Sequence, residues 1–275
     1  MASLKPKKHL GQNFLIDPNY LRKIVAACDL QKNDNVLEIG PGKGVLTKAI
    51  APWVQSVVAV ETDGSLVNHL QGELSSTTPH VQIIHQDFLK FDLQTLPDNM
   101  KVIGNLPYYI VTPIIEKLLQ HLDKFPESYF TVQWEYGQRM TAKPGTKAYG
   151  AFTCFVQFFS EPEILFKIPS TAFHPAPKVQ SCFIKLTRRK ASDLSPDHID
   201  LLFKIIHQAF QQRRKTLPNS LSSLIEKVEL QGLLRQLGLD PKLRAENLSL
   251  DDYIQLTQRM AADRRGRSCG INSNL

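Results

Sequence analysis

The chain has 275 residues, of which 42% are hydrophobic and 21% charged. This composition is ordinary for a globular protein and excludes an intrinsically disordered or fibrous class. No apolar stretch approaches the roughly 20 residues needed to cross a bilayer, so no membrane-spanning segment is expected. A formal net charge of +7 at pH 7 favours an anionic partner but does not identify it.

The cysteines and the N-terminus indicate the cellular compartment. The cysteines are scattered, without a C-x-x-C pair or a histidine at zinc-site spacing: Cys28, Cys154, Cys182 and Cys269. We expect reduced thiols, no metal site and a cytoplasmic protein. The segment up to His9 has lysines but neither the apolar core of a secretory signal nor an Arg-rich leader, so no targeting peptide is expected.

The first predicted element is a helix beginning at Asp17-Pro18, because Asp caps helix N-termini and Pro suits the first helical position. Short apolar runs then predict strands at 36–39, 56–60, 81–85 and 101–104, separated by helix-compatible segments at 45–51, 64–74 and 114–122. Such alternation is typical of a parallel sheet with helices on both faces. Ligands of these sheets bind beyond the carboxyl ends of the strands.

The later part of the chain changes from strands to helices. Segments rich in Phe, Val and Ile predict strands with antiparallel edges at 128–134, 152–159, 164–168 and 178–186. A charged and polar stretch at 188–193 predicts a domain boundary. From Ser195 onward the apolar spacing is helical, with further helices predicted at 222–229, 230–237 and after Ser249, and a frayed basic tail from Ala262.

A glycine-rich loop follows the first strand of the sheet, in the run Glu38-Ile39-Gly40-Pro41-Gly42-Lys43-Gly44. Glycines at alternate positions allow the backbone to approach a ligand closely, which makes Gly40 and Gly42 candidate cofactor-binding residues. A dinucleotide-binding loop has the spacing G-x-G-x-x-G, whereas the third glycine here comes one residue early. That spacing disfavours a nicotinamide-dependent oxidoreductase. The Glu38 carboxylate suits a cationic ligand such as S-adenosylmethionine better than a pyrophosphate.

Acidic residues follow the next strands of the sheet. Glu61 ends the second strand, where a carboxylate can accept both ribose hydroxyls of a nucleoside cofactor. Asp87 follows the third strand and can accept the adenine amino group, with Phe88 beside the ring. Taken singly, such residues are more often helix caps or solvated turn residues, and Asp63 is expected only to cap a helix. At successive strand ends beside a glycine loop, Glu61 and Asp87 favour a cofactor site.

The run Asn105-Leu106-Pro107-Tyr108 comes directly after the fourth strand. The exocyclic amine of adenine is a poor nucleophile because its lone pair is delocalised into the ring. The Asn105 side-chain oxygen and the Leu106 carbonyl can accept its two N–H bonds and direct the lone pair at a methyl donor. Pro107 makes the turn rigid, and Tyr108 offers a ring on which an extracted base can stack. By itself, the run is equally compatible with an ordinary strand end and turn.

Together these motifs resemble the ribosomal RNA adenine N6,N6-dimethyltransferases. The resemblance runs from about Lys7 to Leu256, with further matching segments at 10–15, 133–139, 147–150, 173–179, 213–217 and 244–248. It implies an α/β fold in which a Rossmann-like, S-adenosylmethionine-binding catalytic domain occupies residues 1–188. A small all-helical, rRNA-binding C-terminal domain is implied for residues 189–275.

The resemblance also implies a role for each matching residue. It implies that S-adenosylmethionine contacts Asn13, Leu15, Gly40, Glu61, Asp87 and Asn105. It further implies that Tyr108 and Phe173 hold the target adenine between their rings, while Asn105 and the Leu106 carbonyl hold its amine. Direct in-line transfer is expected, without a dedicated general base.

Basic runs predict where RNA binds. The candidate RNA-binding residues are Arg213, Arg214 and Lys215, and further basic runs lie at 188–190 and 264–267. Taken singly, each run is equally compatible with a solvated face. The expected partner is small-subunit (16S) rRNA in a pre-30S ribosomal particle, and the protein is expected to be a monomer.

The expected function is the dimethylation of two adjacent adenosines near the 3′ end of small-subunit rRNA, during ribosome biogenesis. One alternative is a large-subunit rRNA adenine methylase that confers antibiotic resistance, which the helical C-terminal domain and Thr112-Pro113 disfavour. A mitochondrial relative is disfavoured by the absence of a leader. The alternative from another class is a non-catalytic RNA-binding assembly factor, which the intact Asn105 and Tyr108 disfavour.

Overall fold

A computed structural model describes residues 6–7, 10–74, 78–121, 123–190 and 194–269, with side chains described as far as residue 262. The chain forms two compact units, one of residues 1–138 and 159–189 and the other of residues 139–158 and 190–275. Compared with the expected division at residue 188, the structure differs in one segment, because residues 139–158 belong to the second unit.

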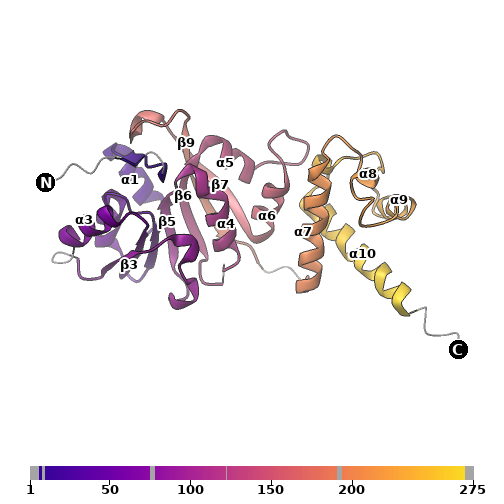
Figure 1. The fold of residues 1–275 in the computed structure, drawn as a ribbon, viewed down its shortest axis with the longest axis horizontal. Helices are drawn as coiled ribbons and strands as arrows, with labels where there is room; N and C mark the ends of the chain where they lie inside the picture. Colours follow the sequence, from indigo (N-terminus) through magenta and orange to yellow (C-terminus); the bar gives the residue numbers. More distant parts are fainter. Residues whose placement is uncertain (1–5, 8–9, 75–77, 122, 191–193, 270–275) are drawn as a thin grey trace. The chain divides into compact units, whose positions relative to one another are not determined.

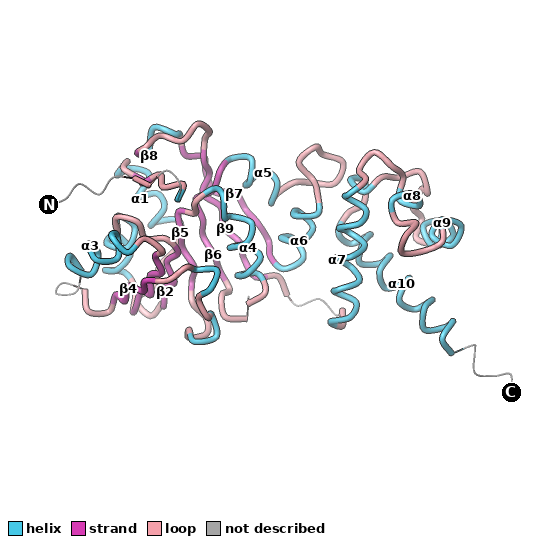
Figure 2. The backbone as a smooth tube through the Cα atoms, viewed as in Figure 1, coloured by secondary structure: helices cyan, strands magenta, loops and turns pink. Residues whose placement is uncertain are grey.

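The first unit is built on a seven-stranded sheet with the strand order β4-β3-β2-β5-β6-β9-β7 (Figures 1 and 2). Neighbouring strands from β4 to β6 are parallel, whereas β9 is antiparallel to both β6 and β7. The prediction of a parallel sheet finished by antiparallel edges is therefore confirmed. The strands are β2 (Asn35–Ile39), β3 (Ser56–Glu61), β4 (Val81–His85), β5 (Lys101–Asn105), β6 (Glu127–Gln133), β7 (Ser160–Ile168) and β9 (Ser181–Arg188).

The helices of this unit begin close to where the sequence predicts. Asp17 caps α1 (Pro18–Ala27) by accepting from the backbone N–H of Asn19, and Pro18 occupies the first turn. The remaining helices are α2 (Val45–Ile50), α3 (Gly64–Leu74), α4 (Val111–Leu119) and α5 (Trp134–Met140), whose last residues pass into the second unit. The central strand β2 is buried from Val36 to Ile39, as expected of a parallel strand covered on both faces. Strand β2 pairs with β3 on one side and β5 on the other, so the carboxyl ends of the three strands lie together at one edge of the sheet. Ligands of such sheets bind at this edge.

A second, two-stranded sheet joins distant parts of the chain. Strand β1 (Phe14–Leu15) pairs antiparallel with β8 (Phe173–His174), with Phe14 opposite His174 and Leu15 opposite Phe173. Because side chains alternate along a strand, Leu15 and Phe173 share one face of this pair. Both belong to a buried apolar cluster that includes Ile24. The segment before α1 is therefore attached to the body of the unit.

The second unit is helical. Its helices are α6 (Ala151–Phe159, whose last residue belongs to the first unit), α7 (Pro196–Gln211), α8 (Leu217–Ser220), α9 (Lys227–Gln236) and α10 (Leu250–Cys269). Buried aliphatic residues of these helices, among them Leu202, Ile206 and Leu230, form its core, and the half-buried rings of Phe155 and Phe203 lie 5.3 Å apart between centroids. The Ser249 hydroxyl accepts from the backbone N–H of Asp252, so the predicted cap of the last helix is confirmed.

Three predictions about local structure are wrong. Residues 152–159 form most of helix α6 and not a strand, and the segment predicted as two helices over 222–237 contains the single helix α9. The backbone of α10 remains helical past Ala262, where a frayed tail was expected. Cys28, Cys154 and Cys182 are buried free thiols, as predicted, while the Cys269 side chain lies outside the described part. No helix in the described part is long and apolar enough to span a bilayer.

Candidate active site

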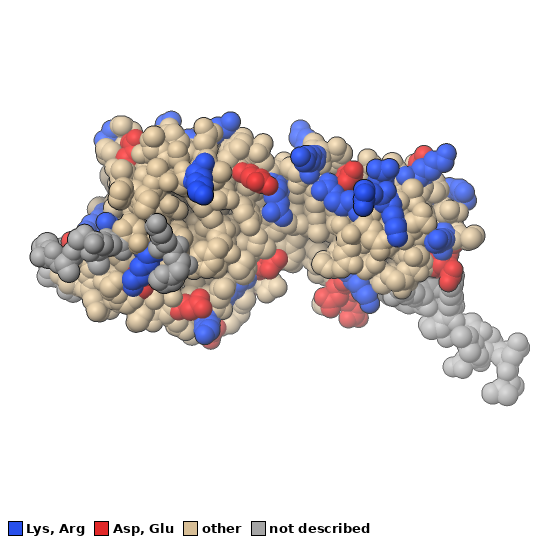
Figure 3. All heavy atoms as spheres, turned by 45° about the horizontal axis from the view of Figure 1, so that its top comes forward, with Lys and Arg blue, Asp and Glu red and all other residues tan. Residues whose placement is uncertain are grey.

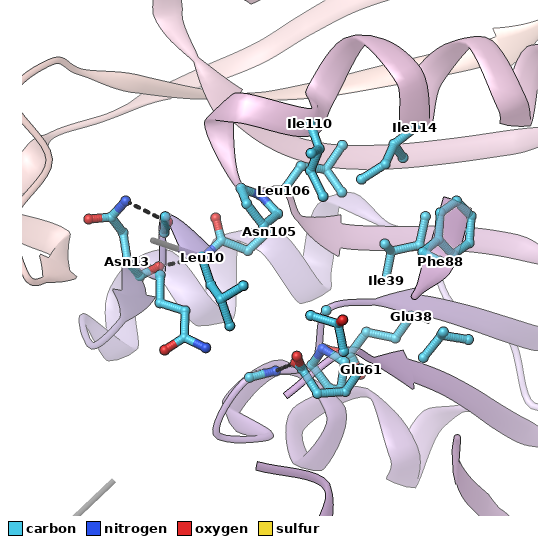
Figure 4. A pocket seen from close by; sticks show the side chains of 18 of the residues that line it. Leu10, Asn13, Glu38, Ile39, Glu61, Phe88, Asn105, Leu106, Ile110 and Ile114 are labelled. Atoms are coloured by element: carbon cyan, nitrogen blue, oxygen red, sulfur yellow. Dashed lines mark hydrogen bonds between the residues drawn. The ribbon is translucent and has the colours of Figure 1, made fainter. Parts of the chain in front are cut away.

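A pocket of about 260 Å³ opens at the carboxyl ends of β2, β3 and β5 (Figure 4). The sequence placed the candidate cofactor-binding residues at this edge of the sheet, and the structure brings them together in the pocket lining: Asn13, Leu15, Gly40, Gly42, Glu61, Asp87 and Asn105. Leu106, Pro107 and Tyr108 line the same pocket. The glycine loop and the Asn-Leu-Pro-Tyr turn therefore face one cavity.

The glycine loop packs closely against side chains from α3 and from the N-terminal segment. Gly44 has a φ of +73°, and a Cβ there would lie 2.3 Å from Leu70 Cδ2. Gly42 also has a positive φ, and a Cβ there would lie 3.0 Å from the Phe14 ring. Glycine is favoured at these positions because other residues are strained at a positive φ and because the Leu70 or Phe14 side chain would have to shift. At Gly42 the close neighbour is a ring of the N-terminal segment.

Glu61 is held rigidly at the end of β3. Its carboxylate accepts from the backbone N–H of Gly42 at 3.0 Å and from that of Asp63 at 2.9 Å. Its burial raises the pKa of Glu61 above the ordinary value, although these two hydrogen bonds act in the opposite direction. Each oxygen accepts one of these bonds and can accept another, and Glu61 lines the pocket. Glu61 is thus a preorganised acceptor for hydroxyl groups.

Glu38 is a buried acid with an unused oxygen. Its side chain lines the pocket beside the glycine loop, and only 1% of the residue is exposed. Among the described residues, none forms a hydrogen bond with its Oε2. Burial raises the pKa of Glu38 to about 7, although hydrogen bonding with Thr47 acts in the opposite direction. A buried carboxylate of this kind is costly when ionised and unpaired, and a cationic group entering the pocket would compensate that cost.

The loop that follows β4 is fixed by a lysine from another element. Asp87 accepts from the backbone N–H of Leu89, and Phe88 is buried next to it. Lys117, from α4, donates to the carbonyls of Phe88 and Leu89 at 3.0 and 2.9 Å, and its ammonium lies 5.5 Å from the Phe88 ring centroid. Burial lowers the pKa of Lys117, against the influence of nearby Asp87. The pocket wall is therefore held by a charged group that no sequence motif singles out.

The N-terminal segment lines the pocket over residues 10–15 and is held by contacts with Asp63 at the start of α3. Lys7 Nζ lies 2.7 Å from Asp63 Oδ1, and Gln12 Nε2 lies 3.1 Å from Asp63 Oδ2. Burial of Asp63 acts to raise its pKa, but the hydrogen bonds from Lys7, Ser65 and Gln12 hold that pKa well below the usual range. Asp63 also caps α3 through Ser65, as predicted, and its contact with the N-terminal segment is an additional role.

Asn105 is oriented by this same segment. Its Nδ2 donates to the main-chain carbonyl of Asn13 at 2.8 Å, as Figure 4 shows. Only the NH₂ group of an amide can donate, so this bond fixes which way the side chain points and leaves Oδ1 as an acceptor. Leu106 is anchored in turn, because its N–H donates to the Thr131 carbonyl in β6. Two acceptors for an amine, the Asn105 oxygen and the Leu106 carbonyl, thus come from a rigid turn.

Phe173 is not where the two-ring expectation places it. Phe173 is only 3% exposed, belongs to the buried cluster and is not among the residues that line the pocket. The cause is the pairing of β8 with β1, which turns Phe173 toward the core together with Leu15 and leaves His174 exposed. Of the two predicted rings, only Tyr108 lines the cavity.

Comparison with known proteins shows the family. A sequence profile described as ribosomal RNA adenine dimethylase matches residues 3–262. This chain belongs to that family. It is 39% identical to the ribosomal RNA small subunit methyltransferase A of Natranaerobius thermophilus, over 92% of this chain and 91% of that protein. It is 42% identical to the protein of the same name from Alkaliphilus oremlandii, over 94% of this chain and 92% of that protein.

Solved structures show that the methyltransferase fold is shared. A dimethyladenosine transferase from Plasmodium falciparum has a TM-score of 0.80 at 24% identity, over 90% of this chain and 98% of that one. The 23S rRNA methyltransferase ErmE has a TM-score of 0.74 at 24% identity, over 90% of this chain and all of the other. The predicted Rossmann-like methyltransferase fold is therefore confirmed for this member of the adenine dimethylase family.

The basic residues expected to bind RNA differ in their surroundings. Arg213 bonds within its own unit, from Nε to Glu246 at 3.1 Å and from its guanidinium to the carbonyl of Tyr149 at 3.2 Å. Arg214 and Lys215 are exposed. Figure 3 shows Lys and Arg side chains gathered on the drawn face of the second unit. The run at 264–267 lies outside the part whose side chains are described.

The described residues contain no cluster of three or more His, Cys, Asp or Glu side chains that could hold a metal ion. The sequence does not single out two residues that contact the site. Lys117 lies within the helix predicted over 114–122, and Ser181, whose Oγ lies 2.8 Å from Tyr108 Oη, lies within the strand predicted over 178–186. Each acts on residues far away along the chain, so local spacing carries no signal for either.

Proposed function

We propose that this protein is an S-adenosylmethionine-dependent rRNA (adenine-N6,N6)-dimethyltransferase. It transfers methyl groups to N6 of two adjacent adenosines near the 3′ end of small-subunit rRNA during subunit assembly. The observation that carries the proposal is the oriented Asn105 amide at the mouth of a pocket fitted for a cationic nucleoside. The relatives at 39% and 42% identity, whose names specify the small ribosomal subunit, support the choice of substrate.

The residues of the pocket fit S-adenosylmethionine. The unpaired Glu38 Oε2 suits a positively charged group, and the fixed Glu61 carboxylate suits the ribose hydroxyls. Asp87 and Phe88 suit the amino group and the ring of adenine, and Lys117 holds their loop in place. When bound, the cofactor supplies a methyl group activated by a sulfonium. Asn13, Leu15, Gly40 and Gly42 complete the enclosure in this proposal.

The chain contributes positioning to the transfer. Asn105 Oδ1 and the Leu106 carbonyl accept the two N–H bonds of the target amine, which localises its lone pair away from the ring plane. Pro107 limits the backbone freedom of the turn, and Tyr108 provides the face on which the flipped base stacks. As the amine attacks, it becomes cationic and acidic, so its proton passes to water. In this scheme Phe173 does not contact the base; it lies opposite Leu15 in the β1–β8 pair and belongs to the same buried cluster.

The substrate is bound outside the pocket as well. The exposed Arg214 and Lys215 are the proposed phosphate contacts, and Arg213 contributes charge while holding its own loop. The base must leave its stack to reach Tyr108, so the surrounding RNA is recognised by shape and backbone. We place this activity in the cytoplasm, with a pre-30S particle as the partner. The enzyme is proposed to be a monomer, and sedimentation of the purified protein tests this oligomeric state.

One labelling experiment tests the proposal. Purified protein is incubated with methyl-labelled S-adenosylmethionine and, separately, immature small subunits, naked small-subunit rRNA and large subunits. We expect incorporation into small-subunit RNA alone. Incorporation into large-subunit RNA would instead identify the antibiotic-resistance type of methylase. Tight subunit binding with no incorporation would identify a non-catalytic assembly factor.

A further inference from the structure

The hydroxyl of Tyr108 is tied to a residue from a distant strand. Tyr108 lies in a 3₁₀ turn (Tyr108–Ile110) just after β5. Its Oη lies 2.8 Å from Ser181 Oγ, although the two residues are 73 positions apart in the sequence. Ser181 is fully buried, while Tyr108 is half-buried and lines the pocket. The far end of the ring is therefore fixed from inside the protein.

Ser181 is itself immobilised by the sheet. It begins β9, where its Cα lies opposite Gln133 of β6 on one side and Ile168 of β7 on the other. Strand neighbours on both sides leave its backbone little freedom. The Tyr108 ring, by contrast, sits in a short turn and can rotate about two side-chain torsions. A bond from the strand to the phenol removes that freedom.

We propose that Ser181 is a positioning residue for methyl transfer, whose hydroxyl holds the Tyr108 ring in the orientation that stacks the target adenine. This rests on the proposed function, in which Tyr108 is the stacking surface. A base bound on a fixed ring presents its amine at a fixed place relative to Asn105, and catalysis by positioning depends on such alignment. The absence of Phe173 from the pocket lining makes the orientation of the remaining ring more important.

The same contact limits the chemistry of Tyr108. Its hydroxyl is engaged by a neutral hydroxyl and burial raises the pKa of the phenol, although the hydrogen bond with Ser181 acts in the opposite direction. Tyr108 therefore contributes its ring face to the reaction and does not move a proton. Tyr108→Phe is consequently expected to lose only the anchoring of the ring, whereas removing Ser181 loses that anchoring and also leaves the phenol without its partner.

A double-mutant cycle tests the inference, with Ser181→Ala, Tyr108→Phe and the double variant assayed on immature small subunits. We expect Ser181→Ala to lower kcat by about 5- to 50-fold, with the dissociation constant of S-adenosylmethionine unchanged, because the orphaned phenol turns toward water. Tyr108→Phe should lower kcat by a smaller factor than Ser181→Ala does. The double variant should recover to the level of Tyr108→Phe, since no hydroxyl then remains to be held.

Ser128→Ala is the matched control, because the Oγ of this buried serine of the same sheet has no hydrogen-bond partner in the part of the chain that the structure describes. It should leave kcat unchanged. If Ser181→Ala does not fold, Ser181→Cys, of similar size and weaker hydrogen bonding, replaces it in the cycle. Additive losses in the double variant, or a loss of cofactor affinity without recovery by Tyr108→Phe, would overturn the positioning role. Full activity of Tyr108→Ala would instead refute Tyr108 as the stacking surface, and with it that part of the proposed function.

Discussion

The side-chain NH₂ of Asn105 donates to the main-chain carbonyl of Asn13 at 2.8 Å, so the turn over residues 105–108 and the N-terminal segment share one hydrogen bond. The bond joins residues 92 positions apart and determines which atom of the Asn105 amide is left to accept. The segment that lines the pocket over residues 10–15 thereby also sets the orientation of the group proposed to hold the substrate amine.

Asn105→Asp should abolish this arrangement with almost no change in size. A carboxylate cannot donate to the Asn13 carbonyl, so the side chain is repelled from that oxygen. We expect kcat to fall by on the order of a hundredfold or more, as when one preorganised contact at a reacting centre is lost. Steady-state methylation of immature subunits measures the change. Asn68→Asp, on the exposed side of α3, makes the same chemical change as a control, and an equal loss there would contradict the role of Asn105.

Glu38 should make cofactor binding depend on pH. The pKa of Glu38 is raised to about 7 by burial, whereas a cationic ligand is bound by the ionised form. Below pH 7 a proton must therefore be released on binding, and the affinity for S-adenosylmethionine should fall by up to about tenfold per pH unit. Calorimetric titration between pH 5.5 and roughly 8 measures this. Glu38→Gln should bind S-adenosylmethionine more weakly, with an affinity that does not change with pH over this range. If the affinity of this variant depends on pH as steeply as that of the unsubstituted protein, Glu38 is not the titrating group.

The same group should influence the stability of the protein without ligand. The folded pKa lies above the ordinary value of 4.5, so the neutral form is favoured by folding and its contribution is fully present at low pH. That contribution is lost as the pH rises from 4.5 through about 7. The Tm of Glu38→Gln relative to the unsubstituted protein should therefore increase over this range. A constant difference in Tm would show that Glu38 ionises freely.

Lys117→Met should weaken cofactor binding from outside the pocket. The substitution removes the donor to the Phe88 and Leu89 carbonyls while keeping most of the aliphatic stem. Losing charge-assisted hydrogen bonds of this kind should raise the dissociation constant of S-adenosylmethionine about 10- to 100-fold. Lys48→Met, which breaks an exposed pair with Glu73, should change it less than about fivefold. If the two variants change the dissociation constant of S-adenosylmethionine equally, Lys117 has no specific role in cofactor binding.

Arg213 and Arg214 should behave differently although they are adjacent. Arg213→Lys keeps the charge but loses the bonds to Glu246 and to the Tyr149 carbonyl, so the stability of the second unit should fall while the salt dependence of RNA binding is retained. Arg214→Ala should leave Tm unchanged and reduce the slope of log affinity against log salt by about 0.7 to 0.9. Filter binding at several salt concentrations measures the slopes. An unchanged slope for Arg214→Ala would show that this residue does not contact phosphate.

Much of the fold could be predicted from local patterns. The buried apolar runs and the cap at Asp17 determine the parallel strands and the first helix, because each depends on residues close together in the sequence. The sequence of helix α6 predicts a strand because its residues, Phe152 among them, are of types that favour strands. In the structure its buried positions, such as Thr153 and Val156, are at helical spacing.

The residues of the candidate site also fall into two groups, those that the sequence predicts and those that only the structure shows. Glu61, Asp87 and Asn105 could be predicted because the carboxyl ends of parallel strands converge. The position of Phe173 could not, since it depends on pairing between residues 14–15 and 173–174, which no local pattern encodes. The contact between Ser181 and Tyr108 has the same long-range origin. Residues that position other residues are thus the part of the site that requires the structure.

Nucleoside analysis of methylated RNA tests most directly whether this pocket delivers methyl groups to adenine. Immature small subunits are treated with S-adenosylmethionine and either the unsubstituted protein or Asn105→Ala, and the digested RNA is examined by mass spectrometry. We expect N6,N6-dimethyladenosine from the unsubstituted protein and none from Asn105→Ala, with cofactor binding by that variant verified separately. Dimethyladenosine at undiminished yield from Asn105→Ala, or a methylated nucleoside other than adenosine, would contradict the proposed site.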